Sequence, residues 1–128
     1  YTNPKAIGKV KKFWENLGIE VIIMRPQMHD RLLSKISHLP HAVSASLVNS
    51  VGKSRLDFAA GGFKDATRIA SGEPELWRDI FLTNKDNLIK DIGILKKELN
   101  KVEAALRNND QAGLLRLLNK AKVVRDSI

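Results

Sequence analysis

Six apolar residues recur at spacings of four and three in the second half of the chain, and this repeat strongly limits the possible folds. They are Leu88, Ile92, Leu95, Leu99, Val102 and Leu106. Residues three and four apart lie on one side of an α-helix, so the repeat predicts one long helix with an apolar seam. Such a seam packs against another helix, as core or as a subunit interface. The pattern therefore favours an all-α fold.

Apolar residues at helical spacing fill most of the remaining chain. The first expected helix begins at Asn3-Pro4 and ends at Gly18, and two more cover 29–48 and 64–70. A fourth runs from Pro74 to Thr83-Asn84, with Ser71 or Gly72 as its cap. The last begins after the cap residue Asp110 and extends to Val124. Residues 53–63 are expected to form a loop. In this loop, Gly61 and Gly62 can take positive φ or let the backbone approach a ligand.

One short segment does not fit the helical pattern. Residues 19–24, IEVIIM, are mostly β-branched and predict a strand. This strand has no partner in the chain, so it belongs to a sheet outside it or is merely extended. The chain also begins at Tyr1 rather than Met and ends at Ile128 directly after a predicted helix. We therefore expect it to be a piece of a longer protein.

The composition excludes several classes of protein. The 128 residues include no cysteine, which excludes disulfide frameworks and thiolate zinc sites and is compatible with the cytoplasm, where we place the protein. The sequence contains no run of 18 apolar residues, so it predicts no membrane span. The net charge of +8 makes a nucleic-acid-binding helical module the alternative to an enzyme. However, no aromatic residue lies within a basic run to stack on bases, so we do not favour nucleic acid.

Two histidines mark the predicted helix at 29–48, which Pro40 should kink. His38 and His41 share one stripe with Ala45 and Val48, and their ring nitrogens are costly to bury without a partner. That partner is a ligand or a backbone carbonyl. A zinc pair is not favoured, because His29 lies too far along the helix axis to be a third ligand. No nucleophile elbow or glycine-rich phosphate loop is present.

Arg68 is the most informative single charge. It lies among apolar residues after the diglycine, where a guanidinium is well matched by a carboxylate or phosphate. The alternative is an ion pair with Asp65 or Asp79. Lys64 and Asp65 alone are most simply surface or interface charges, and Trp77 alone is most simply core.

Three segments together resemble the signature of the prephenate and arogenate dehydrogenases. They are SHLPH at 37–41, GGFKDATRIAS at 61–71, and a following segment with Pro74, Trp77, Asp79-Ile80 and Asn84. Their order matches over nearly the whole chain. The resemblance implies that residues 26–128 form the helical dimerisation and substrate domain. Residues 1–25 would be the helix and strand that end the nucleotide-binding domain.

The resemblance also implies a reaction, the NAD- or NADP-dependent oxidative decarboxylation of prephenate to 4-hydroxyphenylpyruvate in tyrosine biosynthesis. Arginine at position 68 would hold a substrate carboxylate, with His38 and His41 lining the pocket and Trp77 as its wall. Gly61, Lys64 and Asp65 would lie at the mouth, reaching across from the second subunit.

By the same resemblance, the catalytic histidine and the dinucleotide loop belong to the nucleotide domain. We expect no catalytic, cofactor-binding or metal-binding residue in this chain, which alone should be inactive and should not bind NAD. A homodimer is expected, and tyrosine is a candidate feedback ligand. The end of the chain resembles family members that continue into a small regulatory domain, but the sequence does not determine whether one follows. The sequence does not distinguish prephenate from arogenate, or NAD from NADP.

Overall fold

The computed structural model describes residues 3–128, apart from the side chain of Ser54. The regular secondary structure of these residues is entirely helical, with no strand. The all-α prediction is confirmed. The elements in chain order are α1 (Pro4–Asn16), α2 (Pro26–Leu33), the π-helix η1 (Ser34–His38), α3 (Leu39–Val51), the 3₁₀-helix η2 (Lys53–Phe58), α4 (Gly61–Thr67), the 3₁₀-helix η3 (Arg68–Ser71), α5 (Pro74–Thr83), α6 (Lys85–Arg107) and α7 (Gln111–Arg125).

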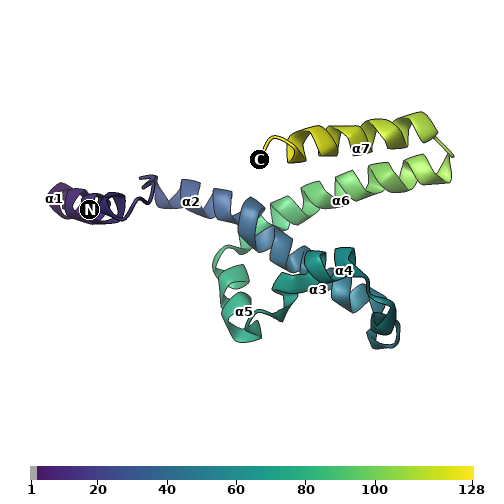
Figure 1. Cartoon of the computed structure of the whole chain (residues 1–128), viewed down its shortest axis with the longest axis horizontal. Coiled ribbons are helices and arrows are strands. Elements are labelled where there is room, and N and C mark those ends of the chain that lie inside the picture. Colours follow the sequence, from purple (N-terminus) through teal and green to yellow (C-terminus); the bar gives the residue numbers. More distant parts are fainter. Residues whose placement is uncertain (1–2) are drawn as a thin grey trace.

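The helices form an open, branched arrangement (Figure 1). Helix α1 stands apart at one end, and α2, η1 and α3 form a continuous rod that crosses the start of α6. On one side of this rod α6 and α7 form a hairpin, and on the other side α4 and η3 pack against α3 while α5 leads into α6. None of the described helices is both long and apolar enough to cross a lipid bilayer.

The first helix begins and ends where the sequence predicts. The side chain of Asn3 accepts a hydrogen bond from the backbone N–H of Lys5 at 2.9 Å, and Gly18 takes a positive φ of 77° just after the helix. The strand predicted at 19–24 is not formed: these residues lack regular secondary structure. A strand is stabilised by ladder hydrogen bonds to a neighbour, and the described residues offer none. The domain division at residue 25 stays a prediction.

A π-turn interrupts the predicted histidine helix just before Pro40. Proline has no N–H to donate to the carbonyl of Ile36, and its ring crowds that carbonyl. The chain responds with a wider turn, in which the N–H of Leu39 reaches back five residues to the carbonyl of Ser34. The predicted kink is therefore a π-turn, after which α3 continues to Val51 with Gly52 as its C-cap.

The segment predicted as a loop, residues 53–63, is mostly helical. Residues Lys53–Phe58 form η2, and α4 already begins at Gly61. Neither Gly61 nor Gly62 has positive φ, because both lie in the first turn of α4. Ser71 and Gly72 do not cap α5 either: the cap position is Glu73, and the Ser71 hydroxyl donates to the carbonyl of Arg68. The first turn of α4 belongs to a helix that packs against α3 and η3, and that packing is not visible in the local sequence.

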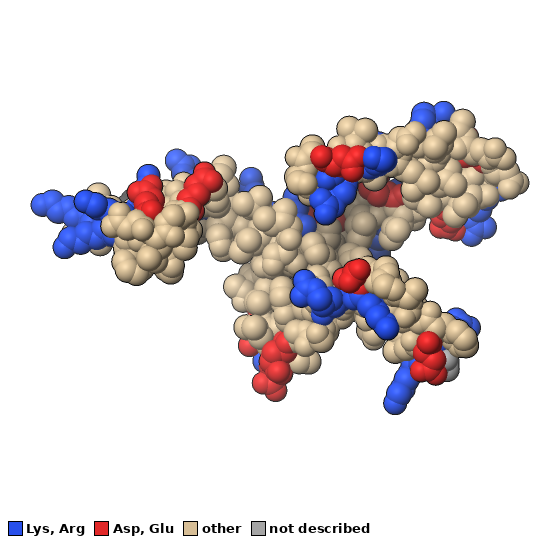
Figure 2. Space-filling model, viewed as in Figure 1, with Lys and Arg blue, Asp and Glu red and all other residues tan. Residues whose placement is uncertain are grey.

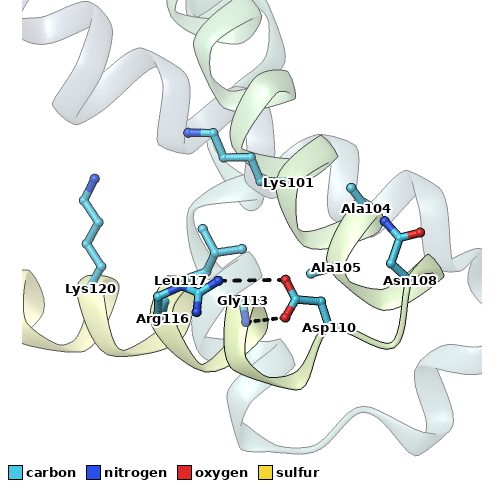
Figure 3. Close-up of a pocket in the computed structure, with 9 residues that line it drawn as sticks. All are labelled: Lys101, Ala104, Ala105, Asn108, Asp110, Gly113, Arg116, Leu117 and Lys120. Atoms are coloured by element: carbon cyan, nitrogen blue, oxygen red, sulfur yellow. Dashed lines mark hydrogen bonds and ion pairs between the residues drawn. The ribbon is translucent and has the colours of Figure 1, made fainter.

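The turn between α6 and α7 is held by Asp110, as predicted. Its carboxylate accepts a hydrogen bond from the backbone N–H of Gly113 at 2.8 Å and lies 3.9 Å from Arg116 Nη2 (Figure 3). A Cβ on Gly113 would lie 2.1 Å from Asp110 Oδ2, so a side chain at position 113 would require the Asp110 carboxylate to shift. The hollow beside the turn has a volume of about 430 Å³.

The chain buries little apolar surface of its own. Among the described residues only Leu88 and Ala105 are buried hydrophobic side chains, whereas Leu99 and Leu106 of the seam are 58% and 59% exposed. An apolar groove of about 440 Å³ runs between α3 and α6, and a second of about 610 Å³ lies between α6 and α7. A chain of this length normally buries a larger core, so these faces are suited to a further protein surface.

Candidate functional site

A stripe of buried polar side chains runs along the central rod. It consists of Ser34, His38, His41 and Ser44, of which none is more than 8% exposed. The π-turn keeps Ser34 and His38 on one side, and α-helical spacing adds His41 and Ser44 to the same side. The interior of this chain is therefore built around hydrogen-bonding groups rather than aliphatic ones.

Asn84 lies in the bend between α5 and α6 and contacts His38. Its Nδ2 lies 3.2 Å from His38 Nδ1 and donates to the backbone carbonyl of Asp30 at 2.7 Å. Its Oδ1 accepts from Asn87 Nδ2 at 2.8 Å. One buried carboxamide thus joins the start of α6 to two points on the rod, Asp30 and His38.

His41 is stacked on Trp77. The ring centroids lie 3.5 Å apart with an interplanar angle of 15°, and Phe81 meets the edge of His41 at 6.1 Å between centroids. A Cβ on Gly72 would lie 2.6 Å from Trp77 Nε1 and 3.0 Å from His41 Cε1. The backbone before α5 therefore approaches both rings closely, and the predicted association of Trp77 with the two histidines is present.

Burial lowers the pKa of both histidines below the ordinary value of 6.5. For His38, the nearby carboxylate of Asp30 opposes this effect and His29 adds to it. Both imidazoles are therefore neutral at pH 7 and cannot supply positive charge to an anionic ligand. Two buried polar atoms, His41 Nδ1 and Ser44 Oγ, have no hydrogen-bond partner among the described residues.

A second buried contact joins the rod to α6. The hydroxyl of Ser34 donates to Asp91 Oδ2 at 2.5 Å, and both residues are almost fully buried. This contact holds Ser34, the first residue of the polar stripe, against α6. It therefore helps to keep the rod in place beside the histidine cluster.

Arg68 begins η3, a short 3₁₀-helix that packs against α3 and α4. Its side chain is exposed and forms no ion pair with the described residues. Asp79 instead pairs with Arg78 at 2.8 Å, and Asp65 remains exposed on α4. The internal ion pairs that offered an alternative for Arg68 are therefore absent from the described chain.

Gly61, Lys64 and Asp65 lie on α4, which packs against α3 and η3. All three are exposed, and nothing lies within 4 Å of a Cβ built on Gly61. The structure places them on α4, next to the Arg68 turn. Their assignment to the mouth of a site stays a prediction.

Several residues of the cluster were not singled out as site residues from the sequence. The sequence predicts Asn84 only as a helix end and a member of the signature, and Gly72 only as a cap. Nothing in the sequence singles out Ser34, Asp91 or Phe81. Only Gly72 carried a usable signal, as a glycine between a short helix and Pro74. The others are brought together by packing across more than 30 residues of sequence.

Metal binding finds no support in the described residues, because no three metal-ligating side chains come together. His29 is exposed and its Nδ1 lies 3.1 Å from Asp30 Oδ1. The basic side chains form separate small groups on the face shown in Figure 2, without a continuous stripe that would follow a phosphate backbone.

An all-helical chain with unfilled apolar grooves and a polar cluster is typical of the helical half of a two-domain enzyme. The family described as prephenate dehydrogenase, dimerization domain, matches residues 25–120. This chain belongs to that family.

Known relatives of this chain are dehydrogenases. The prephenate dehydrogenase of Bacillus subtilis is 37% identical over 133 residues, covering 99% of this chain and 36% of that protein. The cyclohexadienyl dehydrogenase of Zymomonas mobilis is 33% identical over 132 residues, covering 98% of this chain and 45% of that protein. This chain thus spans less than half the length of these relatives.

Solved structures give the same assignment. Prephenate dehydrogenase from A. aeolicus, in complex with hydroxyphenyl propionate and NAD⁺, matches with a TM-score of 0.90 and 37% identity over 98% of this chain and 46% of that chain. Arogenate dehydrogenase from Synechocystis matches with a TM-score of 0.86 and 29% identity over 99% of this chain and 49% of that chain.

Proposed function

We propose that this chain is the substrate-binding and dimerising half of a prephenate dehydrogenase, which oxidatively decarboxylates prephenate to 4-hydroxyphenylpyruvate. The family match and the relatives support the reaction. The main structural support for the proposed site is the cluster of His38, His41 and Trp77. Beside it, the η3 turn presents the exposed side chain of Arg68, which has no ion pair among the described residues.

The cluster suits a dianionic substrate with a six-membered ring. Neutral imidazoles can donate or accept hydrogen bonds, and the indole offers a flat apolar wall. Because the two imidazoles carry no charge at pH 7, the positive charge that pairs with a substrate carboxylate is proposed to come from Arg68. Gly61, Lys64 and Asp65 complete the proposed site at its mouth, contributed by the second subunit.

The cofactor is proposed to be NAD or NADP, held by a different domain. The described residues contain no strand followed by a glycine-rich turn and a helix, so they do not fit a dinucleotide. This chain's part is to bind and orient the substrate. A homodimer in the cytoplasm and feedback by tyrosine belong to the same proposal.

The role of Arg68 can be tested in the complete protein. R68A should raise KM for prephenate by about tenfold or more, while kcat falls far less, because the carboxylate contact exists before the chemical step. Steady-state kinetics measures both constants. R78A is the matched control, since Arg78 is exposed and paired with Asp79. An R68A enzyme with unchanged KM would remove Arg68 from the site.

Arogenate is the second candidate substrate, favoured by the match to the Synechocystis arogenate dehydrogenase. Arogenate differs from prephenate only in the side chain, where an amino group replaces the keto oxygen. The ratio of kcat/KM for the two substrates, measured on the complete protein, decides between them.

A further inference from the structure

We propose that Asn84 is a positioning residue that holds His38 as the neutral tautomer with its proton on Nε2, ready to donate to an oxygen of the anionic substrate. This inference rests on the proposed function for its role in binding. The tautomer itself follows from hydrogen-bond geometry alone.

The first step is the orientation of the Asn84 carboxamide. Its Nδ2 lies 2.7 Å from the backbone carbonyl of Asp30, which can only accept a hydrogen bond. Its Oδ1 lies 2.8 Å from Asn87 Nδ2, which can only donate. A flipped carboxamide would face oxygen with oxygen and nitrogen with nitrogen. Both contacts therefore fix the amino end toward Asp30 and His38.

The second step is the tautomer of His38. The amino group of Asn84 lies 3.2 Å from His38 Nδ1 and has no lone pair to offer, so Nδ1 must accept. In a neutral imidazole the other ring nitrogen then carries the proton. Nε2–H lies on the side of the ring away from Asn84.

The third step is the consequence for binding. Asn84 is 9% exposed and His38 is 8% exposed, so water cannot readily exchange one tautomer for the other at this contact. Burial also lowers the pKa of His38 and keeps the ring neutral. A neutral ring with the proton on Nδ1 would present a lone pair at Nε2 and repel a carboxylate or keto oxygen. The Asn84 contact selects the form that attracts it.

The direct test is nitrogen-15 NMR of the complete protein with labelled histidine, in which H38Q identifies the His38 signals. We expect an unprotonated Nδ1 and a protonated Nε2 near pH 7.5. A protonated Nδ1 in the unaltered protein would overturn the inference. This measurement needs no activity, so it remains decisive even if the complete protein does not oxidise prephenate.

A substitution gives the second test. In N84D, a carboxylate that can only accept faces Nδ1, so the proton should move to Nδ1 or the ring should become doubly protonated. KM for prephenate should rise by about tenfold or more, with a smaller change in kcat. N100D, the same change at an exposed position of α6, should leave both the spectrum and KM unaltered.

The spectrum separates this effect from simple repulsion between the new carboxylate and an anionic substrate. If N84D raises KM but His38 keeps its proton on Nε2 alone, the inference is wrong and repulsion explains the change. If the complete protein does not oxidise prephenate, the proposed function fails independently of the tautomer.

Discussion

At the scale of single residues, Gly72 lies against the stacked rings of His41 and Trp77 and leaves no space for a side chain. A Cβ there would lie 2.6 Å from Trp77 Nε1 and 3.0 Å from His41 Cε1. Either the rings or the backbone before α5 would have to move. Glycine is therefore required here by close approach, since its φ of −63° is open to any residue.

We predict that G72A destabilises the protein by about 1–3 kcal/mol, because overpacking displaces a stacked aromatic pair. Chemical denaturation measures the change in the free energy of unfolding. G8A is the matched control, since a Cβ at Gly8 meets nothing within 4 Å and alanine favours the interior of α1. Equal stability of G72A and the unaltered protein would show that the rings can move freely.

The buried imidazoles also predict a dependence of stability on pH. His38 and His41 have a lower pKa in the folded protein than the value of 6.5 expected when unfolded. As pH falls below about 6.5 the unfolded chain takes up protons first, so the free energy of unfolding should decrease.

Unfolding followed between pH 8 and pH 5 measures this loss on the acid side. The double substitution H38Q/H41Q should reduce the steepness of the loss, while H29Q at an exposed position should retain it. A flat profile between pH 7 and pH 5 for the unaltered protein would contradict the prediction.

At the scale of elements, the π-turn and α6 determine each other's position. The wider turn before Pro40 places Ser34 and His38 on the side that faces α6 and the bend at Asn84. The sequence predicted a helix and a disturbance at Pro40, but not the π-turn. Its register depends on contacts with Asp91 and Asn84, more than 40 residues away.

We predict that S34A destabilises the protein by about 1–3 kcal/mol, because it leaves the buried Asp91 carboxylate without its hydroxyl partner. S127A is the matched control: Ser127 is exposed near the end of the chain and donates to the nearby backbone carbonyl of Val124. Thermal or chemical unfolding gives the difference. A loss of the same size in both variants would mean that the Ser34 contact adds nothing specific.

At the scale of the whole molecule, the apolar surface exceeds what the chain covers by itself. The groove between α3 and α6 is lined largely by apolar side chains from both helices, including Leu47, Leu95 and Leu99. The family is described as a dimerization domain, so a second copy is the occupant that we propose. The regular seam on α6 fits this reading, because its central residue Leu99 remains 58% exposed.

We predict that L99E converts a dimer of the complete protein into monomers at micromolar concentration, because a glutamate buried in an apolar interface lacks a partner. Sedimentation velocity measures the association state. L76E, the same change at an exposed position of α5 outside the groove, should remain dimeric. A dimer that survives L99E would place the interface elsewhere.

The sequence by itself determined the helical class, the positions of α1, α5 and α6, the caps Asn3 and Asp110, and the family. These features depend on residues within one or two turns of each other, or on a signature read in order. Tertiary structure decided the rest: the register of the π-turn against α6, the close approach of Gly72, and the pairing of Asn84 with His38. Each depends on atoms from distant segments meeting in one place, and packing determines that meeting rather than local preference.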